Sequence, residues 1–284
     1  MANIRPAVFA RMGWYPDTGE ECIRLIRQWS LLKIGTKTAD IKAIGGIVPH
    51  AGWYFSGEIA CQVYKLLSKT HPDVVVVFGK HLSVFSQRSI MTDGLWETPL
   101  GNIRIASEIA SVLADEYDFV VETCSRFEED NTIEVQLPFI KYFFPEARLL
   151  PVGLPPTSES LDIARRAGEL CLSNGLNVIS VGSTDLTHYG PNYGFMPAGF
   201  GDNALKWVYH NDERVIKRMC AMDAFGVIEE ALSHHNACCP GACASAIAMA
   251  EKMGALGGDD LVYGTSYDKS PGTSFVGYVG IVFY

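Results

Sequence analysis

Two histidines, a carboxylate with a third histidine, and a pair of adjacent cysteines are the residues in this chain whose types and spacing favour chemistry. They are His50, His81, Asp185, His188, Cys238 and Cys239. Imidazole, thiolate and carboxylate groups are the ligands with which proteins hold transition metals. Parallel-sheet proteins place such groups in the loops that follow strands. The set therefore predicts a metal site at one edge of a sheet.

His50 and His81 each follow a short apolar run that is typical of a buried strand. The runs are Ala43–Val48 and Val74–Phe78, and the second is continuous and β-branched. Consecutive strands of a parallel sheet often lie side by side, so we expect both rings to face one metal ion. The alternative for either residue is a structural histidine in a turn.

Asp185 and His188 lie in the segment 183–190, which follows a third apolar run at Asn177–Val181. We expect His188 to act as a general acid or base, with Asp185 orienting it or a ligand. Capping of a turn by Asp185 is an alternative, but it does not account for His188.

Cys238 and Cys239 lie in a Cys-Cys-Pro-Gly segment that precedes a helix of small residues. The positive end of a helix dipole lowers the pKa of a thiol and favours the thiolate that metals require. Burial as an ordinary small apolar residue is the alternative for both cysteines.

Two further segments are expected to border the cleft. The aromatic residues Trp53, Tyr54 and Phe55 follow His50 and could form a pocket wall for a flat substrate. Asn131 and Glu134 begin a helix with an acidic first turn, for which capping is the default explanation, although either could project into the cleft.

The pattern of apolar residues predicts strands and helices in alternation. The expected strands are 43–48, 74–78, 149–152, 177–181, 261–266 and 275–283, and the expected helices are 56–67, 105–113, 133–144, 158–172, 202–232 with interruptions near Asn211 and Met222, and 244–253. Such alternation is typical of a single α/β domain with a mostly parallel mixed sheet and helices on both faces.

Composition excludes several classes of partner. The formal charge of −9 in 284 residues, with no Lys/Arg cluster, argues against nucleic acid and an anionic membrane surface. No apolar run approaches the roughly 18 residues of a membrane span, and the N-terminus shows no signal-peptide pattern. The eight cysteines lack the spacing of a disulfide framework. We therefore expect a cytoplasmic protein with reduced thiols.

Several of these motifs together resemble those of a known family. They are Pro-His-Ala-Gly-x-x-x-Ser-Gly at 49–57, the strand-end His81, Ile-Glu-Val-Gln-Leu-Pro-Phe at 133–139, Ser-Thr-Asp-Leu-Thr-His-Tyr-Gly at 183–190 and the Cys238 segment. In this order the chain resembles the Memo family, known in bacteria and archaea as AmmeMemoRadiSam system protein B. The resemblance extends from Arg5 to the stretch 266–268.

That family is similar to the class III, LigB-type extradiol dioxygenases, which use non-haem Fe²⁺. The resemblance implies a LigB-like fold, a metal site formed by His50, His81 and Cys238, and an acid/base role for His188 with Asp185 beside it. It implies non-haem iron or copper as the cofactor. Asp185 is the alternative third ligand, and it would restore the two-histidine, one-carboxylate set of the dioxygenases.

The chain departs from the family pattern at three places. Lys80 precedes the second histidine and is expected to add a cation near the pocket. Asp130-Asn131-Thr132 stands where the family has Glu-His-Ser. The cysteine segment reads Cys-Cys-Pro-Gly-Ala-Cys, so Cys239 or Cys243 competes with Cys238 as a ligand.

Two functions fit these residues best. The first is a metal-dependent oxidoreductase, a dioxygenase acting on a small aromatic substrate. The alternative is a non-catalytic metal- or redox-linked binding or signalling protein that docks a peptide or protein partner. A thiol hydrolase using Cys238 and His188 ranks last because it leaves His50 and His81 unexplained. The sequence does not determine the metal or the oligomeric state.

Overall fold

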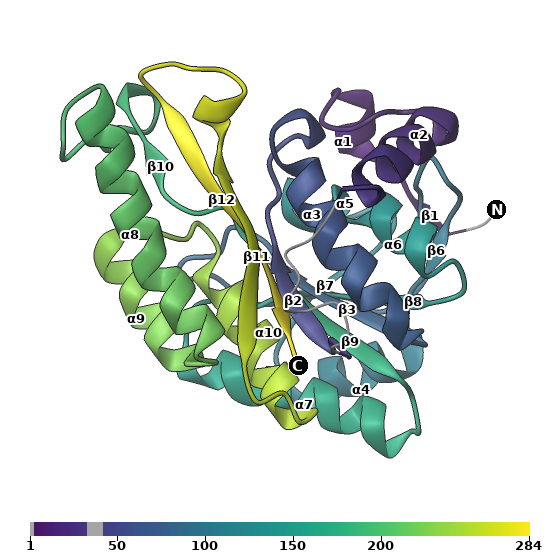
Figure 1. Ribbon diagram of the computed structural model, residues 1–284. Helices are drawn as coiled ribbons and strands as arrows, with labels where there is room; N and C mark the ends of the chain where they lie inside the picture. The colour runs from purple at the N-terminus through teal and green to yellow at the C-terminus, as the bar shows by residue number, and fades with distance from the viewer. Residues whose placement is uncertain (1–2, 33–41) are drawn as a thin grey trace.

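A mixed β-sheet carries the candidate site in the computed structural model, which describes residues 3–32 and 42–284 (Figure 1). In spatial order its strands are β10 (His188–Tyr189), β12 (Phe275–Phe283), β2 (Gly45–Val48), β9 (Val178–Ser183), β3 (Val74–Gly79), β8 (Arg148–Gly153), β4 (Ser89–Met91) and β7 (Val120–Glu122), and β11 (Gly258–Thr265) pairs with β12. The central strands β2, β9, β3 and β8 run parallel. Antiparallel pairs β12–β2 and β4–β8 flank them. The predicted α/β fold with a mixed sheet is confirmed.

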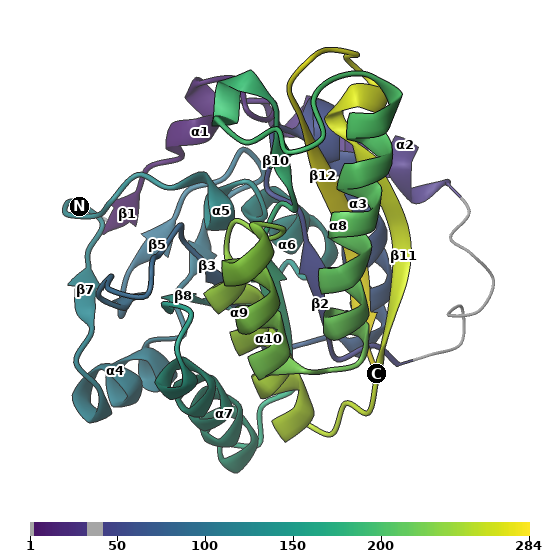
Figure 2. The ribbon, with the colours of Figure 1, turned by 90° about the vertical axis from the view of Figure 1, so that its left-hand side faces the viewer.

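Helices cover both faces of this sheet, which is why its central strands are almost entirely buried. One face carries α4 (Ser107–Glu116), α7 (Ser158–Ser173), α8 (Asp202–Cys220), α9 (Ala224–His234) and α10 (Pro240–Lys252), and the other carries α2 (Gly19–Ser30), α3 (Trp53–Leu67), α5 (Asn131–Glu134) and α6 (Leu137–Phe143) (Figure 2). The short helix α1 (Val8–Arg11) follows β1 (Ile4–Arg5), which forms a small separate sheet with β5 (Leu95–Trp96) and β6 (Ile103–Arg104). None of the helices in the described ranges has both the length and the apolar character needed to cross a membrane.

Each predicted strand and helix has a counterpart in the structure, although two of the predicted helical segments are divided differently. The segment 133–144 forms two helices, α5 and α6, rather than one. The predicted break at Met222 exists, but α8 runs through Asn211 without interruption. The Asn211 side chain is buried and donates hydrogen bonds to Thr187 Oγ1 and to the carbonyl of His234, so it joins α8 to its neighbours.

Some elements were not predicted. Strands β4 and β7 are three residues long, and β7 is half exposed, so they lack a long apolar run. Helix α2 does show the spacing of one buried face, with Cys22, Ile26 and Trp29 buried.

Helix α10 packs unusually close to β9, and this fixes the position of the cysteines that precede it. A Cβ atom added at Gly182 would lie 2.9 Å from the Ala242 carbonyl oxygen and 3.0 Å from Ala246 Cβ. The small residues on both sides therefore let the helix backbone approach the sheet. As a result, Cys238 and Cys239, which precede α10, lie against Thr184 and Asp185, the residues that follow β9, and are hydrogen-bonded to them.

Candidate metal centre and adjoining cavity

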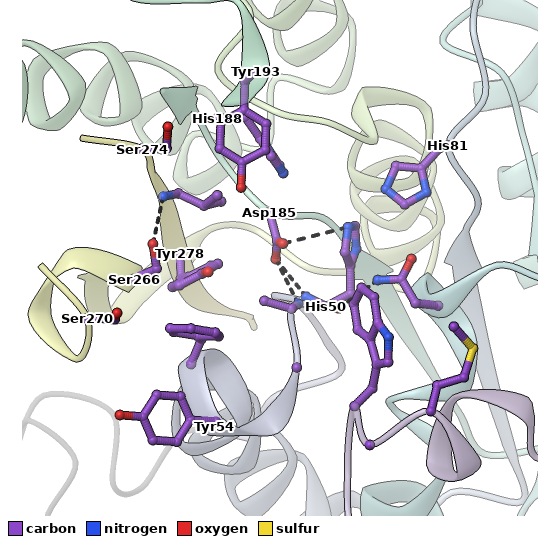
Figure 3. Close-up of a pocket in the computed structure, with 18 residues that line it drawn as sticks. His50, Tyr54, His81, Asp185, His188, Tyr193, Ser266, Ser270, Ser274 and Tyr278 are labelled. Atoms are coloured by element: carbon purple, nitrogen blue, oxygen red, sulfur yellow. Dashed lines mark hydrogen bonds and ion pairs between the residues drawn. The ribbon is translucent and has the colours of Figure 1, made fainter. Parts of the chain in front are cut away.

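Three loops at the carboxyl ends of β2, β9 and β3 meet at the candidate site, and they carry His50, Asp185 and His81. We predicted that β2 and β3 are neighbours, and this is wrong, because β9 lies between them. The two histidines still approach each other across the β9 loop, with ring centroids 4.9 Å apart and planes at 78°. Figure 3 shows His50, Asp185 and His188 around one cavity.

The structure brings His50, His81 and Cys238 together, with Cys239 beside them. One potential donor atom from each of these four residues lies within 4.8 Å of all the others. The His50 ring is buried, and its Nε2 lies 3.2 Å from Cys238 Sγ. His81 is half exposed and closes the group on the solvent side.

A hydrogen-bond partner at Nδ1 orients each of the two imidazole rings. His50 Nδ1 lies 3.3 Å from the hydroxyl oxygen of Ser183, which donates its own proton to the Thr132 carbonyl at 2.7 Å. His81 Nδ1 lies 2.9 Å from Asp130 Oδ2. Each Nδ1 is the donor in these contacts, so a metal would bind each ring at Nε2 in place of any proton there, as in the carboxylate–histidine pairs that support metal ligands elsewhere.

In the absence of a metal, contacts within the donor group shift the pKa values of His81 and Cys238. Burial alone would lower the pKa of His81, but hydrogen bonds with Asp130 and Cys238 raise it to about 10. Burial opposes ionisation of Cys238, yet contacts with Cys239, His50 and His81 lower its pKa well below the ordinary value of 9.0. The thiol is thus poised as the thiolate that metal binding requires.

Asp185 lies at the site but supports the His50 loop. Its Oδ1 accepts hydrogen bonds from the backbone N–H groups of His50 at 2.8 Å and Ala51 at 3.3 Å. Its Oδ2 is 3.9 Å from His50 Nε2, and its carboxylate is not part of the four-donor group. These contacts favour Cys238 over Asp185 as the third ligand.

His188 lines the cavity opposite His50. Its Nδ1 lies 3.1 Å from the Leu186 carbonyl oxygen, so Nδ1 carries a proton and Nε2 is free to exchange one. The ring packs edge-on against Tyr193, with centroids 4.9 Å apart. His188 therefore has the placement that proton transfer to a bound molecule requires.

The cavity has a volume of about 650 Å³ and is lined by aromatic rings and hydroxyl groups. Its lining includes Trp14, Tyr54, Phe55, Tyr193, Tyr278, Ser266, Ser270 and Ser274, besides His50, His81, Asp185 and His188. No Lys or Arg side chain from the described residues lines it. A neighbouring cavity of about 580 Å³ shares His188 and Tyr193 with it and reaches Cys238.

Two expected cavity residues lie elsewhere. Lys80 has a left-handed backbone, with φ of 73°, and its buried amine pairs with Glu122 and with Glu128 at 3.5 Å. It does not line the cavity, so it adds no cation there. Trp53 is a core residue stacked on Phe139 at 4.3 Å, whereas Tyr54 and Phe55 do line the cavity.

Asn131 and Glu134, the two polar residues expected to cap the α5 segment, have different roles. Asn131 lines the cavity and donates a hydrogen bond to the His50 carbonyl at 2.8 Å. Glu134 is turned away from the cavity and accepts from the backbone of Val8 and Phe9, so it caps α1.

Sequence reasoning missed several residues of the site. Asp130 does cap α5 through Thr132, but it also orients His81. Thr184 Oγ1 accepts the backbone N–H of Cys239 at 3.0 Å. Tyr193 and Tyr278 come from segments without a motif. The one signal available in the sequence was the Asp130 carboxylate at the N-cap position, directly before α5.

The loop that carries His188 is anchored to α8 by Asp212, whose carboxylate is fully buried. Thr187 donates its backbone N–H to Oδ1 at 3.0 Å, and Tyr263 donates its hydroxyl to Oδ2 at 2.8 Å. Burial outweighs these bonds and raises the pKa of Asp212 from 3.8 to about 6.

This shift predicts a pH-dependent stability difference between wild type and Asp212→Asn. The unfolded chain ionises Asp212 near pH 4, whereas the folded chain keeps the proton until about pH 6. The stabilisation is therefore present below the unfolded pKa and is lost as the pH rises through the folded one. Between about pH 4 and about pH 7, the free energy of unfolding of wild type should fall by about 2 kcal/mol relative to the variant. Urea unfolding at both pH values measures this, and a constant difference would contradict it.

Comparison with known proteins identifies the family. The family model described as Memo-like protein matches residues 5–282. The chain belongs to the Memo family. A MEMO1 family protein of Methanopyrus kandleri is 34% identical over 98% of both chains, and one of Pyrococcus abyssi is 33% identical over 98% of both. The resemblance found in the sequence is thus confirmed over almost the whole chain.

One solved structure supports the fold. The crystal structure of an uncharacterized protein from Escherichia coli K12 superposes with a TM-score of 0.51, at 10% identity, over 79% of this Memo chain and 92% of that chain. At this identity the likeness shows a related fold alone.

Proposed function

We propose that this Memo-family protein binds a transition metal, iron or copper, through His50, His81 and Cys238, and that it acts as an oxidoreductase on a small aromatic substrate. The observation that carries the proposal is a group of imidazole and thiol donors whose two histidines line an aromatic, hydroxyl-lined cavity and whose Cys238 lines the cavity beside it. The donor types suit iron and copper. The bound metal would supply the redox chemistry.

The residues of the chain would bind and orient the substrate. The cavity volume of about 650 Å³ is that of a small-molecule site. Tyr54, Phe55 and Trp14 would contact a flat ring, and the serine hydroxyls would bind its polar substituents. His188 would take a proton from a phenolic hydroxyl at its free Nε2, while Asp185 keeps the His50 loop in place.

Oxygen uptake tests this role. Protein loaded anaerobically with Fe²⁺ should consume O₂ when a catechol is added. His188→Ala should keep its iron and lose O₂ uptake by about 100-fold or more, since it removes a general base. His210→Ala, an exposed histidine on α8, is the matched control and should behave as wild type.

Metal content without O₂ uptake would refute the oxidoreductase role. It would favour the second candidate, a metal-linked binding protein, which the thiolate ligand supports because sulfur is softer than the carboxylate of the dioxygenases. Equal activity in wild type and His188→Ala would remove the acid/base assignment.

A further inference from the structure

The donor group at the site contains a fourth member that the three-ligand proposal does not use. Cys239 Sγ belongs to the same set of atoms within 4.8 Å as the ligands from His50, His81 and Cys238. The Cys239 side chain is only 1% exposed and lines neither of the two cavities that border the site. It therefore reaches the group from the protein interior, opposite the cavity.

The spacing of the two sulfur atoms matches a tetrahedral metal site. With metal–sulfur distances near 2.3 Å, two thiolates on one tetrahedral ion lie about 3.8 Å apart. Cys238 Sγ and Cys239 Sγ are 3.8 Å apart. For sulfur and imidazole nitrogen the expected spacing is about 3.6 Å, and Cys238 Sγ lies 3.2 Å from His50 Nε2.

Backbone contacts explain how adjacent cysteines present both sulfurs to one point. Successive side chains of an extended strand point in opposite directions, but Cys239 has φ of −127° and ψ of 63°, outside the regular conformations. The segment is held on the β9 loop, because Cys238 N–H donates to the Asp185 carbonyl at 3.0 Å and Cys239 N–H donates to Thr184 Oγ1 at 3.0 Å. The Asp185 N–H in turn donates to Cys238 Sγ at 3.3 Å.

We infer that Cys239 is a fourth metal ligand, so that this chain can bind a d¹⁰ cation, Zn²⁺ or Cu⁺, in a closed tetrahedral site of two histidines and two cysteines. A set of two sulfur and two nitrogen donors in tetrahedral geometry is typical of zinc. The inference rests on the proposed function, in which His50, His81 and Cys238 hold a metal. With all four ligands bound, no coordination position faces the cavity, whereas the three-ligand form leaves one open.

Cobalt titration counts the thiolates directly. The reduced, metal-free, full-length chain is titrated anaerobically with Co²⁺, whose near-ultraviolet thiolate band grows with the number of bound sulfurs and whose visible bands report tetrahedral geometry. Competition with Zn²⁺, and with a coloured Cu⁺ chelator, then gives the two affinities.

The variants are Cys239→Ser and a matched control, Cys243→Ser. Cys243 is buried in the same segment but lies outside the donor group. Cys239→Ser should lose about half of the thiolate band and bind Zn²⁺ and Cu⁺ about 100-fold or more weakly, since loss of a ligand should cost at least as much as loss of its supporting residue. Cys243→Ser should match wild type.

The outcomes separate this inference from the proposal on which it depends. An unchanged thiolate band and unchanged affinities in Cys239→Ser, with both lost in Cys238→Ser, would overturn the fourth ligand and keep the three-ligand site. If Cys238→Ser also keeps the thiolate band and the affinities, both the fourth ligand and the three-ligand site would be overturned. If Cys239→Ser does not fold, X-ray absorption of the zinc-loaded wild type decides, since it distinguishes two sulfur ligands from one.

Discussion

Replacing both His50 and His81 with alanine is expected to abolish stoichiometric metal in the purified protein and to leave the fold intact. The double variant removes two of the four donors, and the remaining cysteines cannot complete a site. His50 and His81 lie in loops at strand ends rather than in the packed strands, so the sheet should still form. Elemental analysis of protein purified without added metal or chelator measures the result.

The matched control is His71→Asn/His210→Ala, which changes two histidines outside the donor group. Asparagine suits position 71 because His71 has a left-handed backbone, with φ of 49°. Iron or copper near one per chain in wild type and control, and its absence from the double variant, is the expected pattern. Equal metal in all three proteins would remove the site, and circular dichroism would show whether the double variant is folded.

The second large effect concerns the third ligand. Cys238→Ser is expected to weaken Cu⁺ binding by about 100-fold or more, and far more than Asp185→Asn does. Serine lacks the soft sulfur that Cu⁺ prefers. Asparagine at position 185 can still accept the backbone N–H groups of His50 and Ala51 through its carbonyl oxygen, so the His50 loop should keep its shape.

Competition with a Cu⁺ chelator under anaerobic conditions ranks the two variants. The opposite ranking would make Asp185 the third ligand and would strengthen the resemblance to the dioxygenase site. Both backbone hydrogen bonds of the Asp185 carboxylate go to Oδ1, so in that case Oδ2, which lies 3.9 Å from His50 Nε2, would be the ligand atom.

The sequence predicted the strands that carry the site because almost all of their residues are apolar or small. Val74–Gly79 is buried at every position, and so is Val178–Ser183, and each is followed at once by polar residues. Strand-end histidines could therefore be recognised before the sheet was known. The cysteine pair was recognisable because two adjacent cysteines precede a run of small residues that predicts a helix at 244–253, although the helix begins four residues earlier, at Pro240.

The order of the strands could not be predicted in the same way. Nothing in the local pattern places β9 between β2 and β3, because that arrangement depends on long crossover connections. The orientation of the Lys80 side chain could not be predicted either. It depends on the left-handed backbone of Lys80 and on its ion pair with Glu122, a residue of the distant strand β7. Tyr193 and Tyr278 could not be assigned to the cavity from the sequence, because only the tertiary structure brings their segments beside it.

The insertion of β9 between β2 and β3 also bears on how the protein is made. His50 and His81 leave the ribosome early, but the strand that separates them comes about a hundred residues later, and the cysteines come later still. A nascent chain that has exposed both histidines thus has neither the strand that spaces them nor a sulfur ligand. Metal insertion should follow completion of the sheet, and a chain that stops before Cys238 would lack the sulfur ligands for the ion.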